Sequence, residues 1–487
     1  MSTFDDLRQA KIEKLQAIKK LGIDPYPAKF DQKQTCLQAK EKEGSVVTVA
    51  GRLRSLRGHG GSLFADLVDQ SGKIQLFFSK KDVGGEKFSL LELLDLGDFI
   101  GVTGGVFKTQ AGEITVKVAD FSLLTKSIAP LPEKFHGLTD MEVRLRQRYL
   151  DLIMNPEVRE MFIKKSKFWV AVRKFLADKG FMEVETPVLE SVPGGADATP
   201  FITHHNALDT DFYLRISLEL HLKRLLVGGY EKIFEIGRVF RNEGIDAEHL
   251  QDYTLLEFYW AYADYNDLME LIEEFYKYLV KETTGGLKTV YKGKEVDWSG
   301  DWPKFDYCEL FKKKTGLNPV KTTGQQLFEK AVELKLKPEK NLGKGRLMDL
   351  IYKNTVRPGL IQPCFLINSP VEISPLTKRH KEISEISQRM HPMAGGTELG
   401  NGFSELNDPL DQRARFEEQQ KLRDAGDSEA QTIDEDFVTA LEYGMPPTAG
   451  FGMSERFFAF LMDKPIRECV FFPPMRGDNL EIINPNF

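Results

Sequence analysis

The sequence has few cysteines and no long apolar run. Its four cysteines, Cys36, Cys308, Cys364 and Cys469, are far apart and form no CxxC pair, which argues against a zinc site or a disulfide framework. No apolar stretch approaches the roughly 18 residues needed to span a bilayer. The N-terminus, MSTFDDLRQAKIEKLQ, lacks the apolar core of a signal peptide. These absences predict reduced thiols, no membrane span and a cytoplasmic protein.

An excess of positive charge is also absent. The formal net charge is −7 at pH 7, which excludes a protein that binds nucleic acid by global charge alone but not one with a local basic face. The 487 residues, 41% hydrophobic and 29% charged, have the composition of a globular enzyme with two or three domains.

The N-terminal part of the chain divides into a helical and a β-rich segment. Residues 3–21 place apolar side chains at helical spacing, and residues 1–45 are predicted to be a helical extension. Five short β-rich runs follow within residues 46–127, with a helix-like insertion after the third. This order predicts an OB-fold barrel, whose strand face commonly binds single-stranded nucleic acid.

Residues 128–140 form a predicted proline-containing linker, and residues 141–487 a second domain. A long helix is expected from Glu157 to Lys179, followed by a short strand from Phe181 to Thr186. Residues 305–355 are lysine-rich and helical in pattern, which predicts an inserted helical subdomain.

The segment FEIGRVFRNEGIDAEHLQDYTLLEFYWAY, residues 234–262, gathers charged and aromatic residues. Arg241 and Glu243 are two apart, so on a strand they share a face, and Glu257 and Tyr259 share a face of the returning strand. An arginine suits a phosphate or a carboxylate ligand. A surface hairpin held by salt bridges explains the same residues, so the segment alone leaves both interpretations open.

Three motifs in order carry a family resemblance. Residues 234–262 resemble the second signature motif of class II aminoacyl-tRNA synthetases, VETPVL with its preceding helix resembles the first, and AGFGMSERFFAFL (449–461) resembles the third. Long stretches, among them PGGADATPFITHHNALDTDFYLRISLELHLKRLLVGG and ELGNGFSELNDPLDQRARFE, are similar to lysyl-tRNA synthetases of the bacterial type. The resemblance implies an α+β fold: an OB-fold barrel that binds the anticodon, and a class II catalytic domain with an antiparallel sheet flanked by helices.

The resemblance also implies the reaction. A lysine–tRNA ligase attaches L-lysine to the 3′ end of tRNA(Lys) through a lysyl-adenylate, with ATP and Mg²⁺ as cofactors. The lysine carboxylate attacks the α-phosphate of ATP in line, so the protein positions groups and neutralises charge rather than supplying a nucleophile. The implied partners are tRNA(Lys), L-lysine, ATP and a second copy of the chain, bound through the first-motif helix.

Functional residues carry over position by position. Arg241, on the α-phosphate and the lysine carboxylate, and Arg456, on the γ-phosphate, are the implied catalytic residues. The implied ATP site consists of Arg241, Glu243, His249, Tyr253, Glu398 and Arg456. The implied lysine site consists of Gly195, Glu219, Arg241, Glu257, Tyr259, Asn401, Phe403 and Glu405. The implied anticodon contacts are Phe64, Gln75 and Glu113.

The sequence departs from the family around the implied ATP site. Glu398 matches a magnesium-binding carboxylate, but His391 stands where a second metal-binding glutamate is expected. Glu248 stands where the family usually has an arginine. Because the loss of one acid and the loss of one arginine offset each other in charge, we expect fewer tightly held magnesium ions. The adjacent His204 and His205 alternate faces, which is not the spacing of a metal pair.

Three other functions fit part of the pattern. An aspartate or asparagine synthetase needs an arginine for the substrate side chain, whereas this chain offers glutamates. A protein modifier that transfers lysine, built on the same catalytic domain, would lack the barrel. An inactive RNA-binding relative fits the altered second-motif loop, but it does not explain the retention of Arg241, Glu243, Glu398 and Arg456.

Overall fold

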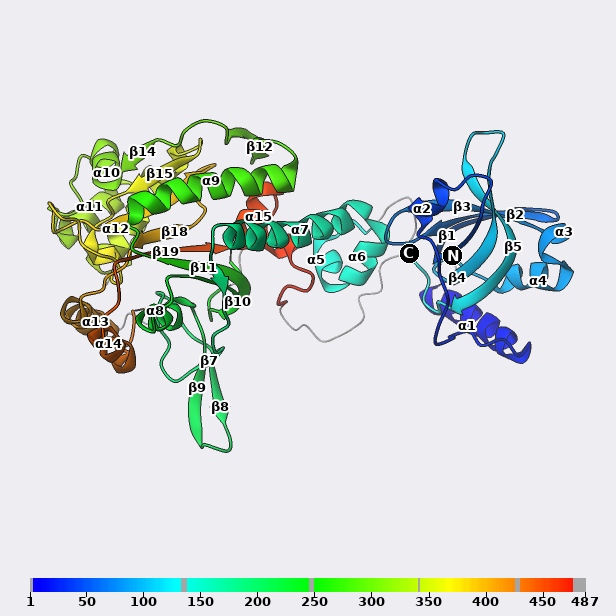
Figure 1. Ribbon diagram of the computed structural model, residues 1–487, viewed down its shortest axis with the longest axis horizontal. Helices are drawn as coiled ribbons and strands as arrows, with labels where there is room; N and C mark the ends of the chain where they lie inside the picture. The colour runs from blue at the N-terminus through cyan, green and yellow to red at the C-terminus, as the bar shows by residue number, and fades with distance from the viewer. Residues whose placement is uncertain (1–2, 133–137, 245–248, 340–341, 425–429, 476–487) are drawn as a thin grey trace. The chain divides into compact units, whose positions relative to one another are not determined.

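The chain divides after Asn155 into two units (Figure 1). The computed structural model describes residues 3–132, 138–244, 249–339, 342–424 and 430–475. Within these ranges no helix has the length and apolar character required to cross a membrane. The first unit also contains the short helices α5 (Met141–Arg146) and α6 (Arg148–Met154), so it extends past the linker expected at residues 128–140.

A closed barrel with the strand order β1-β2-β3-β5-β4 forms the body of the first unit. Its strands are β1 (Val46–His59), β2 (Ser62–Val68), β3 (Lys73–Ser79), β4 (Phe99–Lys108) and β5 (Ile114–Thr125). The expected helical insertion is present as α3 (Lys80–Val83), α4 (Gly85–Leu90) and the 3₁₀ turn η1 (Leu91–Leu93). The prediction of an OB-fold barrel is confirmed.

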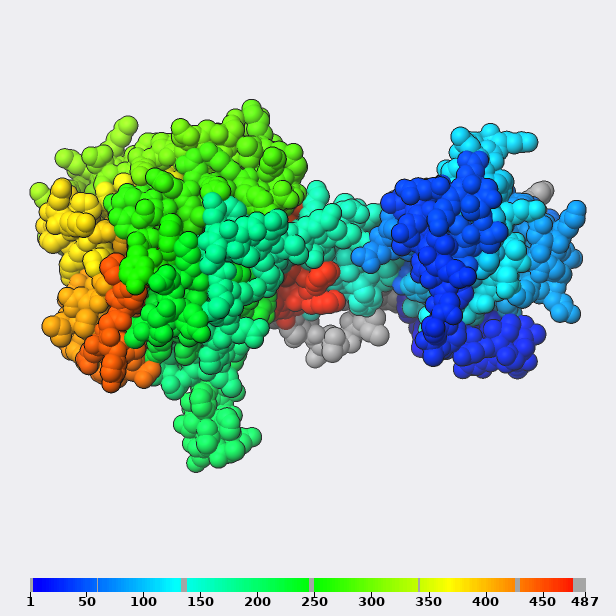
Figure 2. All heavy atoms as spheres, viewed as in Figure 1, coloured from blue at the N-terminus to red at the C-terminus, as the bar shows by residue number. Residues whose placement is uncertain are grey.

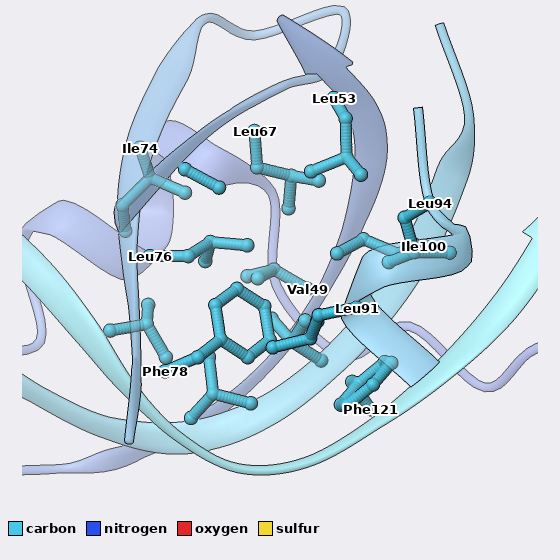
Figure 3. Packing of buried hydrophobic residues seen from close by; sticks show 14 of the residues in the cluster. Val49, Leu53, Leu67, Ile74, Leu76, Phe78, Leu91, Leu94, Ile100 and Phe121 are labelled. Carbon is cyan, nitrogen blue, oxygen red and sulfur yellow. The ribbon is translucent and has the colours of Figure 1, made fainter. Parts of the chain in front are cut away.

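Alternation along the barrel strands fills the barrel with aliphatic side chains. Ile74, Leu76 and Phe78 of β3 point inward and are fully buried, as are Leu67 of β2 and Val49 of β1 (Figure 3). Because successive side chains of a strand point to opposite faces, the residues between them face outward.

The N-terminal helix is fastened to the barrel by charge. α1 (Phe4–Lys20) begins at the capping residue Thr3, and a short α2 (Cys36–Lys40) follows it. Lys14 lies 2.7 Å from Asp95, which also pairs at 2.6 Å with the fully buried Lys126. The helix expected over residues 3–21 is confirmed.

A large mixed sheet with the order β14-β15-β16-β18-β19-β11-β10-β6 forms the centre of the second unit, and β17 pairs with β16. Its strands are β6 (Met182–Glu183), β10 (Lys232–Phe240), β11 (Asp252–Ala261), β14 (Lys304–Asp306), β15 (Cys364–Ile367), β16 (Arg389–Ala394), β17 (Thr397–Glu398), β18 (Asn401–Ser404) and β19 (Thr448–Ser454). All pairs are antiparallel except β14–β15 and β10–β6. The antiparallel character expected of the sheet is confirmed for its centre.

Helices cover both faces of this sheet (Figure 1). α7 (Pro156–Asp178) and α9 (Tyr265–Thr284) lie side by side, and α9 packs on β16, β18 and β19. α8 (Glu219–Val227) packs on β11 from the other side and contacts α14 (Glu435–Glu442), which lies against α13 (Pro409–Asp424). α15 (Arg456–Leu461) follows β19 directly, and the 3₁₀ turn η4 (Ile466–Cys469) follows α15.

Two sequence expectations in this unit need adjustment. The strand expected from Phe181 to Thr186 is only the two-residue β6, because it pairs with β10 at Met182 and Glu183 alone. The helical insertion at 305–355 contains α10 (Tyr307–Thr315), α11 (Gly324–Glu333) and α12 (Lys344–Thr355), but it is entered through β14, a strand of the main sheet. Short 3₁₀ turns, η2 (Arg357–Gly359) and η3 (Val371–Ile373), follow it.

Two small sheets stand apart from the large one. β12 (Lys288–Tyr291) pairs with β13 (Lys294–Asp297), and β7 (Leu189–Glu190), β9 (Thr210–Leu214) and β8 (Ile202–His205) form a three-stranded sheet. The β8–β9 hairpin projects from the body of the second unit (Figure 2). His204 lies on this exposed hairpin with Nδ1 2.9 Å from Asp211, which agrees with a structural rather than a metal-binding role.

Candidate active site

A cavity of about 310 Å³ lies on the α8 side of the large sheet. Its walls come from the β10–β11 hairpin, β18, β19, the start of α8 and the turn at residues 195–197. All the residues predicted for the lysine site line it: Gly195, Glu219, Arg241, Glu257, Tyr259, Asn401, Phe403 and Glu405. The fold therefore gathers into one cavity residues that are more than 200 positions apart in the sequence.

Strand register explains how β11 contributes to the cavity. Glu257 and Tyr259 face it, whereas Phe258 between them packs against Phe275 of α9, with ring centroids 6.4 Å apart. The neighbouring strand β19 places Gly452 opposite Glu257 and Gly450 opposite Tyr259. A Cβ atom at Gly450 would lie 2.1 Å from Glu405 Oε1, so only glycine leaves room for these side chains.

Three buried carboxylates form one end of the cavity. Glu257 accepts hydrogen bonds from Ser217 Oγ at 2.8 Å, Tyr259 OH at 3.0 Å and the Leu218 backbone N–H at 3.2 Å. Glu219 and Glu405 lie against the same cavity. Glu405 Oε1 is buried and has no hydrogen-bond partner among the described residues. An unsatisfied buried acceptor of this kind indicates a missing donor.

Burial shifts the pKa values of these carboxyl groups upward. Burial and the nearby Glu219 carboxylate raise the pKa of Glu257 to about 7. Burial also raises the pKa of Glu219 and, more strongly, that of Glu405, while the ammonium of Lys223 opposes both shifts. A ligand that brings a positive charge to this end would stabilise the ionised carboxylates.

Arg241 also lines the cavity. Its Nε donates to the Ile216 carbonyl at 3.3 Å, its backbone N–H donates to the Gln251 carbonyl at 2.7 Å, and its guanidinium lies 5.5 Å from the centre of the Tyr253 ring. The expectation that Arg241 and Glu243 share a strand face is wrong, because β10 ends at Phe240.

Glu398 on β17 lines the cavity, and His391 lies next to it on the neighbouring strand β16. His391 Nδ1 is 3.0 Å from Glu398 Oε1. Although burial acts against it, the positive charge of His391, Arg389 and Arg456 lowers the pKa of Glu398 to about 2. Among the residues that the structure describes, no group of three or more His, Cys, Asp or Glu side chains could hold a metal ion by itself.

Glu398 and His391 fit a magnesium ion whose ligands are mostly phosphate oxygens of a bound nucleotide. Mg²⁺ is usually bound through one or two carboxylates together with substrate phosphates, and it prefers oxygen to imidazole nitrogen. The ionised carboxylate of Glu398 meets that requirement. The imidazole of His391, held against Glu398, does not add an oxygen ligand.

Arg456 lies in a neighbouring cavity of about 260 Å³ with Tyr291 and Phe460. Its Nη2 donates to Thr397 Oγ1 at 2.7 Å, which places it next to Glu398. The preceding residue, Glu455, is buried and accepts from the Thr254 backbone N–H at 2.9 Å. The third motif is thus a glycine-containing strand that ends at an acid–arginine pair, as expected.

Three predicted ATP residues, Glu243, His249 and Tyr253, lie outside the walls of both cavities. Glu243 lies three residues beyond the end of β10, and His249 is exposed. Glu248, at the position where the family usually has arginine, lies outside the described residues, so its expected effect stays a prediction.

The predicted anticodon residues lie on the outer face of the barrel or at its edge. Phe64 is not part of the core; it pairs across β2 and β3 with Phe77, with ring centroids 4.9 Å apart. Gln75 Oε1 accepts from Thr115 Oγ1 at 2.9 Å, and Glu113 precedes β5. Phe77 and Phe107, whose ring centroids are 6.4 Å apart, extend the aromatic surface, and the sequence argument missed them.

Comparison with known proteins agrees with both halves of this architecture. Residues 140–476 match the family model described as tRNA synthetases class II (D, K and N), and residues 47–124 match the model of the OB-fold nucleic acid binding domain. The chain belongs to the class II tRNA synthetases of this group. The family model covers most of the chain, including every residue of the candidate cavity.

Three full-length relatives of this class II synthetase share one name. The chain is 48% identical over 485 residues to "Lysine--tRNA ligase" of Thermoanaerobacter pseudethanolicus, which covers 98% of this chain and 97% of the relative. It is 47% identical to the protein of the same name from Moorella thermoacetica and 45% identical to that of Bacillus subtilis. Each of these two matches covers 97% of this chain and 98% of the relative.

Several residues that the sequence argument missed belong to the synthetase cavity. Arg389, Ser217, Asp197 and Gln431 line it. Arg389 Nε donates to Asn401 Oδ1 at 2.8 Å and so orients a predicted site residue. Arg389 and His391 are two apart on β16, so the alternation of that strand was the available signal.

The cysteines have no part in the cavity. All four are free, and burial raises the pKa of each thiol to about 12. The buried positions of Cys36, Cys364 and Cys469 agree with the prediction of structural thiols.

Proposed function

We propose that this class II synthetase attaches L-lysine to the 3′ end of tRNA(Lys) through a lysyl-adenylate. The observation that carries the proposal is the cluster of Glu219, Glu257 and Glu405 at one end of the cavity, with Glu405 Oε1 buried and unpartnered. A substrate ammonium has three N–H donors and one positive charge, which are what this end lacks.

The charges on the cavity wall give the bound amino acid a direction. With its ammonium at the glutamates, lysine would point its carboxylate toward Arg241, a cation that lines the same cavity. Phe403 and Tyr259 enclose the apolar part of the side chain. The carboxylate is thereby presented to an α-phosphate bound at Arg241, and in-line attack releases pyrophosphate.

We place the remaining phosphates of ATP near Arg456 and Glu398. Arg456 carries the positive charge that a γ-phosphate requires, and Tyr253 offers an aromatic face beside Arg241 for the adenine. Mg²⁺, when bound with ATP at Glu398, supplies neutralisation of phosphate charge. The single carboxylate favours a small number of magnesium ions, as the sequence argument expected.

The second step joins the activated lysine to a terminal ribose hydroxyl of the tRNA. Anticodon bases would stack on the outer barrel face at Phe64 and Phe77, with Gln75 and Glu113 reading base edges. We also propose a cytoplasmic location for the enzyme.

A homodimer is the proposed assembly, and exposed apolar side chains favour it. Val170 on α7 is 63% exposed, Met182 on the edge strand β6 43%, and Leu189 on β7 46%. An uncovered sheet edge flanked by apolar side chains is a surface that a second chain can complete.

The assignment of the carboxylate end is tested by Glu405→Gln. We expect the Kd for L-lysine to rise at least about tenfold, because a neutral amide removes one charge from the ammonium site, while the Kd for ATP changes by less than about twofold. Calorimetric titration of both ligands measures this. Glu190→Gln is the matched control, since Glu190 is a buried glutamate outside the cavity wall. Equal losses for lysine and ATP would remove Glu405 from the ammonium site.

A further inference from the structure

Lys223 is a buried cation directly behind the carboxylate end of the cavity. Its side chain is fully buried, and it lies one helical turn after Glu219 on α8. Lys223 Nζ is 2.5 Å from Glu219 Oε1 and forms a second ion pair with Glu405 Oε2. Glu219 and Glu405 line the cavity, whereas Lys223 does not.

The pairing leaves the other side of Glu405 for a ligand. Oε2 faces Lys223, while Oε1, next to Gly450 on the cavity wall, has no partner among the described atoms. The Lys223 ammonium is also 5.6 Å from the ring centre of Phe403, another residue of the cavity wall. Lys223 therefore interacts with three residues of the proposed lysine site, Glu219, Glu405 and Phe403, without lining the cavity itself.

Without Lys223, Glu219 and Glu405 would lose the buried ammonium with which both form ion pairs. Carboxylates in that situation take up protons or turn toward other donors, because an unpaired buried charge is strongly unfavourable. Either change removes negative charge from the place where a substrate ammonium would bind.

We infer that Lys223 is a specificity-determining positioning residue, which holds Glu219 and Glu405 at the cavity wall so that they select an ammonium-bearing amino acid. The inference rests on the proposed function of this cavity. Lys223 acts through the two glutamates and does not touch the substrate.

The test compares two ligands that differ in the charge of the side chain. L-lysine and L-norleucine, which lacks the terminal ammonium, are titrated into the full-length enzyme and into Lys223→Met, whose uncharged side chain is one atom shorter than that of lysine. We expect the Kd for lysine to rise at least about tenfold in Lys223→Met, and the Kd for norleucine to change by less than about twofold. Equal losses for both ligands would indicate a purely structural role and would overturn the inference, as would an unchanged lysine Kd.

Lys126→Met is the matched control. Lys126 is also fully buried between two carboxylates, Asp95 and Asp98, but it lies in the barrel unit. Its removal breaks a comparable ion-pair cluster and should leave the affinities for lysine and norleucine unchanged.

A double variant keeps the inference testable if Lys223→Met folds poorly. In Glu405→Gln/Lys223→Met one buried charge of each sign is removed, and we expect the Kd for lysine to rise less than about tenfold above that of Glu405→Gln, because Lys223 acts partly through the glutamate already replaced. A further rise of about tenfold or more would mean that the two residues act independently, which contradicts the inference. Failure of the proposed function is distinguishable, because the unaltered enzyme would then bind lysine no better than norleucine.

Discussion

At the scale of single residues, Glu257 makes lysine binding dependent on pH. Burial and Glu219 raise the pKa of Glu257 to about 7, compared with about 4.3 for a free glutamate. Below pH 7 the group is therefore protonated in the unliganded protein, and an arriving ammonium must displace that proton. The affinity for lysine is complete above pH 7 and is lost as the pH falls through 7.

We expect the Kd for L-lysine to be about tenfold higher at pH 6 than at pH 8, because the ionised fraction of Glu257 changes by that factor. Calorimetry in buffers of different ionisation enthalpy should also detect proton release at pH 6. Glu257→Gln should flatten the pH dependence. A Kd that is constant between pH 6 and pH 8 would show that Glu257 is already ionised in the empty cavity.

The same scale shows where sequence reasoning stops. Glu219, Glu257 and Glu405 could be assigned from family resemblance, since their positions match motifs. Lys223 could not, because its ion pair with Glu405 joins residues 182 positions apart and leaves no local pattern. The unpartnered oxygen of Glu405 is likewise a property of the packed structure alone.

At the scale of elements, Glu455 connects the three motifs. It precedes α15, accepts from the Thr254 backbone N–H of β11 at 2.9 Å and forms an ion pair with Lys165 of α7. Lys165 also donates to the Cys469 carbonyl at 2.7 Å. Because Arg456 follows Glu455 directly, this network fixes the position of a proposed catalytic arginine.

We expect Glu455→Ala to destabilise the catalytic unit by about 3 kcal/mol, since it leaves Lys165 without its carboxylate in a largely buried place. All four tryptophans, Trp169, Trp260, Trp298 and Trp302, lie in that unit, so urea unfolding followed by tryptophan fluorescence reports on it. Glu274→Gln, which removes an exposed pair with Lys179, should shift stability by less than about 1 kcal/mol. Similar shifts for both variants would contradict the proposed importance of Glu455.

The local sequence pattern predicted some helices and strands correctly but not the bounds of others. The alternation of Ile74, Leu76 and Phe78 and the apolar spacing of residues 3–21 identified the barrel and α1, because both features depend on neighbours in sequence. The length of β6 and the end of β10 at Phe240 depend on which strands pair, and pairing is a long-range property.

At the scale of the whole molecule, the exposed apolar surface of α7 and β6 predicts a dimer. The purified protein should have a mass near twice 55.4 kDa by light scattering. Val170→Asp should shift it toward the monomer, because a charge at a buried interface position is unfavourable. Leu410→Asp, at an even more exposed apolar position on α13, is the control and should remain dimeric. A monomeric parent protein, or a dimer unaffected by Val170→Asp, would refute this interface.

The central claim is that the cavity activates lysine. ATP–pyrophosphate exchange tests it most directly, with L-lysine, L-aspartate and L-asparagine supplied one at a time. The carboxylate cluster predicts exchange with lysine and none above background with the other two, because neither brings a positive charge to Glu219, Glu257 and Glu405. No exchange with lysine, or faster exchange with aspartate or asparagine, would contradict the account.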